Sequence, residues 1–166
     1  MTRALKINPY KRGFTLIELV IVLIVMSIVA VFIASRASTS GNELIAETDT
    51  LKSHLRYAQI RAMNDSEFWG IHIPNAGSYV LYKNNAPAAG HMLPGEKPGA
   101  SPVPQTHTFP GNMTVSSGAG KTYNFDRWGM PVDAVGSPLL ANQSITLSEG
   151  AATSSITITK NTGHIP

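Results

Sequence analysis

The sequence contains no cysteine, and this absence removes several classes of chemistry. A disulfide framework, a thiolate metal site and a cysteine nucleophile are all excluded. The 166 residues also contain no complete Gly-x-x-x-x-Gly-Lys-Ser/Thr phosphate-binding loop and no Gly-x-Ser-x-Gly nucleophile turn. We therefore expect no enzymatic activity, no catalytic residue and no bound cofactor.

Charge is also missing from one long stretch near the N-terminus. Apart from Glu18, residues 14–35 carry no charged side chain. An apolar run of about 20 residues is long enough to cross a bilayer as a helix, whereas the apolar core of a secretory signal peptide holds only about 7–15 residues. The segment before the run has no acidic residue but several basic ones, which keep a short N-terminus cytoplasmic. The pattern predicts one membrane span over residues 14–35, with the remainder of the chain outside.

The basic residues before residue 13 account for the positive net charge of +3. Without Arg3, Lys6, Lys11 and Arg12, the chain has nine basic and ten acidic residues, a net charge of −1. A nucleic-acid interface needs a basic patch or stripe. If the N-terminal segment is removed, composition gives no reason to expect a nucleic-acid partner.

Glu18 is the single acid within the apolar run, and its position becomes informative if the chain is cut. A cut between Gly13 and Phe14 makes Glu18 the fifth residue of the new chain, four residues from a new α-ammonium group. An opposite charge within about 4–6 Å favours an ionised carboxylate, and helix N-termini also favour acids. Within one chain this pair is a local contact. Between chains, the same pair sets the register of neighbouring subunits.

The stretch "KRGFTLIELVIVLIVMSIVA" resembles the class III signal of type IV pilins and type II secretion pseudopilins. In that family a prepilin peptidase cuts after the glycine and methylates the new N-terminal amine. The resemblance implies that Gly13 precedes the cut, that Phe14 becomes the methylated first residue, and that Glu18 serves in assembly. Lys11 and Arg12 match the basic end of the leader.

Residues 36–64 predict an amphipathic helix with one apolar face. Ser40 or Asn42 can begin it. The predicted core positions recur at steps of three and four residues, whereas the opposite face is charged and predicted to be solvated. A nearly continuous helix from Phe14 to about Met63 is also expected, loosened at Gly41. The predicted core positions are Leu44, Thr48, Leu51, Leu55, Ala58 and Ala62, and the charged face carries Glu43, Glu47, Lys52 and Arg56.

In the remaining residues, 65–166, apolar and polar side chains alternate, as they do in β-strands. The segments "FWGIHI" and "YVLYK" predict one antiparallel hairpin, and "SITLSE" and "SSITITK" predict another, with "MTVSS" and "TYNF" between them. Residues 86–112 hold six prolines and four glycines, which predict an extended loop. The expected fold is α+β, with a long N-terminal helix packed on two small antiparallel sheets.

Three further segments narrow the resemblance. "LKSHLRYAQIRAMND", "FDRWGMPV" and "ITLSEGAATSSITITKNTGHI" are similar to the H-type minor pseudopilins and the related FimT-like minor pilins. Some FimT-like proteins bind DNA through basic residues near the C-terminal hairpin. This chain offers only Lys160 there. Because DNA affinity depends on several phosphate contacts, we expect no binding to nucleic acid.

Several polar residues have a structural explanation that we prefer to a chemical one. The five histidines, at positions 54, 72, 91, 107 and 164, show no metal-ligand spacing. Asp126 and Asp133 are expected to form turns instead of a calcium site, and we expect no metal. Trp69 and Trp128 are expected in the core.

The resemblance implies a minor pseudopilin of a type II secretion pseudopilus. Such a subunit is inserted in the bacterial inner membrane, processed, and assembled through its N-terminal helix with its domain in the periplasm. Its partners are other pseudopilins, prepilin peptidase and the inner-membrane assembly platform, with energy from a separate ATPase. One alternative is a major or minor type IV pilin in a surface fibre for adhesion, motility or DNA uptake. Another is a membrane-tethered periplasmic binding domain or enzyme that never polymerises.

Overall fold

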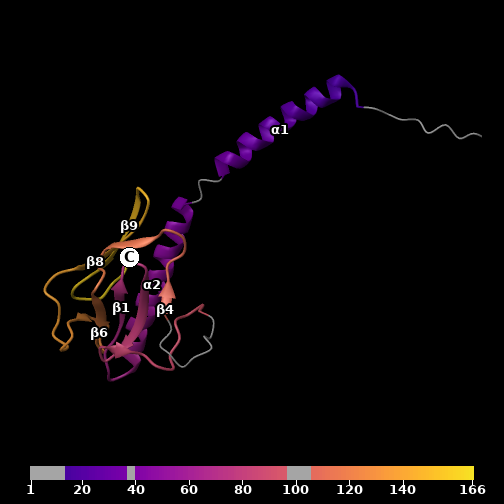
Figure 1. Ribbon diagram of the computed structural model, residues 1–166. Helices are drawn as coiled ribbons and strands as arrows, with labels where there is room; N and C mark the ends of the chain where they lie inside the picture. The colour runs from indigo at the N-terminus through magenta and orange to yellow at the C-terminus, as the bar shows by residue number, and fades with distance from the viewer. Residues whose placement is uncertain (1–13, 37–39, 97–105) are drawn as a thin grey trace, which may run out of the picture. The chain divides into compact units, whose positions relative to one another are not determined.

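The computed structural model describes residues 14–36, 40–96 and 106–166 (Figure 1). The chain divides into two compact units, residues 1–39 and residues 40–166. The first unit contains α1 (Leu16–Arg36), and the second contains α2 (Ser40–Asn64) together with the strands. The predicted helix start was Ser40 or Asn42, and α2 begins at Ser40, the first described residue after position 39. The predicted continuity between the two helices depends on residues 37–39, which lie outside the described residues.

The strands of the second unit form two antiparallel sheets, so the predicted α+β fold is confirmed. The larger sheet has the order β3-β2-β1-β6-β7, and β4 also pairs with β2. The smaller sheet has the order β5-β8-β9. The bounds are β1 (Trp69–Asn75), β2 (Ser78–Lys83), β3 (Ala86–Pro87), β4 (Thr106–Thr108), β5 (Thr114–Ser117), β6 (Thr122–Phe125), β7 (Pro131–Val132), β8 (Gln143–Glu149) and β9 (Ala152–Ile158).

The apolar face of α2 forms the centre of the core. All six predicted core positions are buried: Leu44, Thr48, Leu51, Leu55, Ala58 and Ala62. The helix packs with this face against β1 and β6 of the larger sheet and against β8 and β9 of the smaller one (Figure 1). The hydroxyl of Thr48 donates to the Leu44 carbonyl at 2.7 Å, so its burial leaves no donor unpaired.

The prediction that the charged face of α2 is solvated is correct for Glu43 and Arg56, which are exposed. It is wrong for Glu47, whose side chain is only 12% exposed and contacts His107. The helical repeat placed Glu47 correctly on the flank of α2. The helical repeat gives no information about the segment around His107, which is distant in sequence and folds over that flank.

The prediction of an extended loop over residues 86–112 is wrong at both ends of the segment. Two short strands lie within it, and β4 pairs with the first half of β2 while β3 pairs with the second half. Ala88, Leu93 and Phe109 are buried in the core. Threonines on either side of His107 favour a strand despite the nearby prolines, because β-branched residues suit an extended backbone. Residues 97–105 lie outside the described part of the chain.

The two tryptophans differ. Trp69 is buried, as predicted, and its indole N–H donates to the Asp65 carboxylate at 3.1 Å. Trp128 is 67% exposed, so its predicted core position is wrong. It lies in the turn after Asp126, where the ring stacks under the Arg127 guanidinium at 5.2 Å from the ring centroid. A residue at the tip of a turn lies away from the core, so even a large aromatic side chain is exposed there.

Candidate functional site

Thr15, the residue before α1, caps the first turn of this helix. The backbone N–H of Glu18 donates to the Thr15 hydroxyl at 3.3 Å and to the Thr15 carbonyl at 3.1 Å. Thr15 therefore occupies the N-cap position and Glu18 the third helical position, the spacing of a capping box. The sequence signal Thr-x-x-Glu at residues 15–18 was sufficient to identify this cap. The backbone N–H of Glu18 thus takes part in this cap, separately from the predicted role of its carboxylate in assembly.

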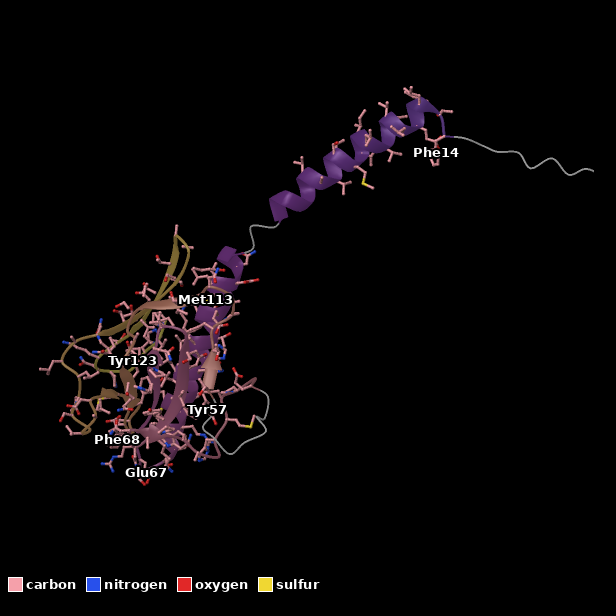
Figure 2. The ribbon with its side chains drawn as sticks, viewed as in Figure 1. Phe14, Tyr57, Glu67, Phe68, Met113 and Tyr123 are labelled. Carbon is pink, nitrogen blue, oxygen red and sulfur yellow. The ribbon has the colours of Figure 1, made fainter. Side chains whose placement is uncertain are left out.

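Glu18 lies on a helix whose other surface is apolar. Figure 2 shows Phe14 at the N-terminal end of α1 and side chains projecting on every side of the helix. Phe14 is 81% exposed, and Val20 is the least exposed large apolar residue between Leu16 and Val31, at 38%. A helix that is apolar all round needs an apolar environment. In the described part of the chain, no ion pair engages the Glu18 carboxylate.

The hydroxyl of Ser27 is satisfied within the same helix. It donates to the Leu23 carbonyl at 2.7 Å. This bond leaves the Glu18 carboxylate as the polar group of the described α1 side chains that still needs a partner. An apolar helix with one such carboxylate is suited to pairing with a cation presented by another molecule.

The remaining predicted site residues belong to the N-terminal segment. Gly13, Lys11 and Arg12 lie outside the described residues. Within residues 14–36, 40–96 and 106–166, no helix combines the length and the apolar character required for crossing a membrane. The predicted span over residues 14–35 stays a prediction.

In the second unit, three sequence segments that carried the finer resemblance meet at one side chain. The amide nitrogen of Gln59 on α2 donates to the Gly129 carbonyl at 2.8 Å and to the Gly163 carbonyl at 3.1 Å. The Arg56 guanidinium, one turn earlier, donates to the Ile165 carbonyl at 2.7 Å. The "AQ" of α2, the "FDRWG" segment and the C-terminal glycine therefore form one junction that fastens the tail to the helix.

Gly163 is required at this junction by its surroundings. Its φ is +63°, in the left-handed region that glycine adopts without strain. A Cβ at this position would overlap the Gly129 carbonyl oxygen and lie 2.5 Å from the Gln59 amide nitrogen. The close approach of the two backbones therefore allows only glycine.

We expect Gln59→Ala to lower the free energy of unfolding by about 1–3 kcal/mol, because it leaves partly buried carbonyls without a donor. Ile60→Ala is the matched control, since Ile60 is the next residue of α2 and is 56% exposed. We expect the control to change stability by less than about 0.5 kcal/mol. Urea denaturation of the full chain in detergent measures both. Equal losses in the two variants would contradict a specific role for the Gln59 amide.

Asp126 and Asp133 form two copies of one turn. The Asp126 carboxylate accepts from the backbone N–H groups of Trp128 and Met130, both at 2.9 Å. The Asp133 carboxylate accepts in the same way from Val135 at 2.9 Å and Ser137 at 2.8 Å. The turn prediction is confirmed. The repeat Asp-x-x-Gly-x-Pro, seven residues apart in "DRWGMPVDAVGSP", was present in the sequence and was missed.

A polar cluster inside the second unit was also missed. His107 on β4 contacts the carboxylates of Glu47 on α2 and Glu96, one through each ring nitrogen. Its ring stacks on Tyr79 of β2, with centroids 4.6 Å apart. His54 of α2 lies 5.8 Å from His107, edge to face. The histidine cluster, defined by these five residues, joins α2, two strands and the part of the chain after β3 that carries Glu96.

One hydrogen bond of His54 fixes which of its ring nitrogens is a donor. Its Nε2 lies 2.8 Å from the Pro94 carbonyl, which only accepts, so Nε2 carries the hydrogen. Its Nδ1 lies 2.8 Å from the Tyr79 hydroxyl, which donates to it when the ring is neutral. Burial lowers the pKa of His54, the bond to Pro94 opposes this, and the neighbouring His107 adds to the lowering. His54 is therefore neutral at physiological pH.

The pKa of His107 is shifted in the opposite direction to that of His54. Burial lowers the pKa of His107, but the hydrogen bonds and charges of Glu47 and Glu96 outweigh that effect, so the pKa is raised. Burial, reinforced by the same two carboxylates, raises the pKa of Tyr79. An imidazolium between two carboxylates is thus the favoured state of the cluster.

No arrangement of three or more histidine or acidic side chains suited to a metal ion occurs among the described residues. The ring nitrogens of His54 and His107 are all engaged with protein groups. Metal ligands need a free nitrogen lone pair. The histidine cluster is therefore a structural junction in the state described here.

Residues 8–34 match the family described as Prokaryotic N-terminal methylation motif. Comparison with curated proteins and with solved structures finds no match. The matched residues include the predicted cleavage position and all but the last two residues of α1, and the motif is the signal of type IV pilins and pseudopilins. The match supports a pilin-like or pseudopilin precursor that is membrane-anchored, is processed by prepilin peptidase and assembles with other pilins.

Proposed function

We propose that this chain is a minor pseudopilin, a non-catalytic subunit of a type II secretion pseudopilus. The observation that carries the proposal is α1, a helix apolar on all sides with one unpaired carboxylate in a capped first turn, within the matched methylation motif. An exposed apolar helix of this kind gains free energy when neighbouring helices cover it, and the carboxylate selects the partner's position through a cation.

The finer assignment is supported by the second unit. The junction of Gln59, Gly129 and Gly163 joins the segments that resemble the H-type minor pseudopilins and FimT-like minor pilins. The subunit is proposed to enter the inner membrane with its N-terminus in the cytoplasm and its domain in the periplasm. Other pseudopilins and the inner-membrane assembly platform are its proposed partners, and DNA is not among them.

Gly13→Val tests the processing step. We expect the variant to keep residues 1–13 and to lose methylation of Phe14, because the peptidase of this family cuts after glycine. Intact-mass spectrometry of the full chain from cells with active prepilin peptidase measures both changes. Gly41→Val, outside the matched motif, is the control and should be processed normally. A wild-type chain that keeps its leader in such cells would refute the assignment.

The abundance of the subunit separates the two pilus-like candidates. A minor pseudopilin should be a trace component of purified filaments or should stay with the cell envelope. A major type IV pilin should dominate sheared surface fibres and begin with methylated Phe14. Quantitative mass spectrometry of sheared filaments against total protein makes the distinction. A dominant subunit would replace the secretion assignment with that of a type IV pilin.

A further inference from the structure

β9 is the outer strand of the smaller sheet, and it is longer than the other outer strands. It has seven residues, whereas β3 and β7 have two, β4 has three and β5 has four. All seven pair with β8 without a break in register. On its other side, β9 pairs with no strand of the part of the chain that is described.

The turn between β8 and β9 shows which backbone groups of β9 are free. Glu149 pairs with Ala152 across the two-residue turn Gly150–Ala151, a position that is hydrogen-bonded in tight hairpins. Hydrogen-bonded and non-hydrogen-bonded pairs then alternate along an antiparallel ladder. Thr153, Ser155 and Thr157 therefore direct their N–H and C=O groups away from β8. Among the described residues, none supplies a backbone hydrogen bond to these groups.

This edge lacks the features that keep exposed strands from pairing. Natural edges are shortened, bulged, or protected by lysine or proline. No charged residue and no proline lies between Glu149 and Lys160. The ladder between β8 and β9 has no bulge, whereas those between β1 and β2 and between β5 and β8 are irregular. An open edge of this kind is a template for strand addition.

The side chains of β9 define which strand would fit beside it. Three exposed hydroxyl residues alternate with positions that face the core, where Ile156 and Ile158 are buried. The Ser155 hydroxyl already pairs with a hydroxyl of β8, since its oxygen lies 3.1 Å from that of Thr146. Cross-strand hydroxyl pairs stabilise sheets. A matching strand alternates hydroxyl and apolar residues and carries no charge, and β9 itself meets this description.

We propose that β9 pairs antiparallel with β9 of a second copy of this chain, about a two-fold axis at Ser155. Ser155 then lies opposite the same residue of the other copy, and Thr153 lies opposite Thr157. The free N–H and C=O groups of these three residues are satisfied in both chains, and two three-stranded sheets become one. A self-complementary patch of this kind forms a closed dimer. The inference is independent of the proposed secretion function.

Ser155→Cys tests the pairing in the full-length chain in cell membranes. Because the chain has no cysteine, the new thiol is the only one in the protein. Hydrogen-bonded strand pairs have Cα atoms about 5.5 Å apart, within the range of a disulfide. We expect oxidation to give a dimer that runs at twice the mass on a non-reducing gel and that reductant reverses.

Thr146→Cys is the matched control, because Thr146 lies on the same face but one strand further in. The two thiols would then be separated by three strand spacings, about 14 Å, too far for a disulfide. We expect at least about tenfold more cross-linked dimer from Ser155→Cys. Equal cross-linking of the two variants, or a Ser155→Cys variant that stays monomeric on oxidation, would overturn the proposal.

Ser155→Lys gives a second measurement that does not depend on a thiol. It places like charges opposite each other at the axis, and we expect it to convert a dimer into a monomer in detergent, measured by light scattering. Circular dichroism should show an unchanged fold, because the position is exposed. Wild-type protein that is monomeric at the same concentration would refute the pairing. Slow amide exchange at Ser155 in the monomer would also refute it, because it would show that something else already covers the edge of β9.

Discussion

Glu18→Ala subunits are expected to fall at least about 100-fold below wild type in filaments, in a strain that lacks the native copy. The reason is electrostatic. Removing one member of a buried ion pair costs about 3–5 kcal/mol, because the other charge is left unpaired, and about 1.4 kcal/mol corresponds to a factor of ten. The measurement is the ratio of filament-bound to total processed subunit, by quantitative mass spectrometry.

Two further variants separate charge pairing by the Glu18 carboxylate from capping of α1, in which the structure shows Thr15 and the Glu18 backbone N–H. Glu18→Gln keeps the length of the side chain and the ability to serve in a capping box, but it removes the charge. Thr15→Ala removes the hydroxyl that accepts from the Glu18 N–H, but it keeps the charge. Loss of a cap typically costs about 1 kcal/mol.

Charge pairing requires that Glu18→Gln fail as severely as Glu18→Ala, with Thr15→Ala remaining largely competent. If Glu18→Gln assembled normally and Thr15→Ala did not, assembly would require the cap of α1 and not the charge of Glu18. Each variant should still begin at Phe14, so intact-mass analysis of the unassembled fraction shows that processing is not the step affected. Normal assembly of Glu18→Ala would remove the proposed role altogether.

Sequence reasoning succeeded where a local pattern controls local structure. The step of three and four residues from Leu44 to Ala62 predicted the buried face of α2 because side chains that share a helical face meet the same neighbour. The turns at Asp126 and Asp133 follow from a carboxylate that reaches the N–H groups two and four residues ahead. The α+β fold followed from the change of period after α2.

The same reasoning failed where the partner of a residue is distant in the chain. Glu47 was predicted to be solvated because nothing near it in sequence places His107, sixty residues later, against it. β4 lies among prolines and was not predicted, because it forms by pairing with β2, a segment distant in the chain. The Thr-x-x-Glu cap and the Asp-x-x-Gly-x-Pro repeat were readable signals that were overlooked. The open edge of β9 could not be predicted from the sequence, because identifying it requires the register of the pairing between β8 and β9, which only the structure supplies.

The histidine cluster should make the stability of the second unit depend on pH in a defined direction. The folded pKa of His107 is raised above its ordinary value of 6.5. A raised folded pKa means that the folded state holds the proton more tightly than the unfolded chain does. The stabilisation is therefore complete below about pH 6.5 and is lost as pH rises through the folded pKa.

His54 acts in the opposite sense and must be separated from His107. Its folded pKa is lowered, so the folded state resists protonation and loses stability as pH falls below about 6.5. The profile of the wild type alone mixes the two effects. Comparing His107→Gln with the wild type removes the common contribution of His54, apart from the charge that His107 itself exerts on it.

His107→Gln is expected to be about 3–5 kcal/mol less stable than wild type near pH 6, since two partly buried carboxylates lose the cation between them. The difference should shrink toward high pH, where neutral His107 has one N–H and can donate to only one carboxylate. His72→Gln is the control, because His72 bonds the Thr122 hydroxyl at 2.8 Å and faces no acid of the cluster. Urea denaturation of the full chain in detergent from pH 5 to pH 9 measures all three proteins. A His107→Gln deficit that stayed constant over that range would show that packing on Tyr79, and not the shared proton, holds the cluster together.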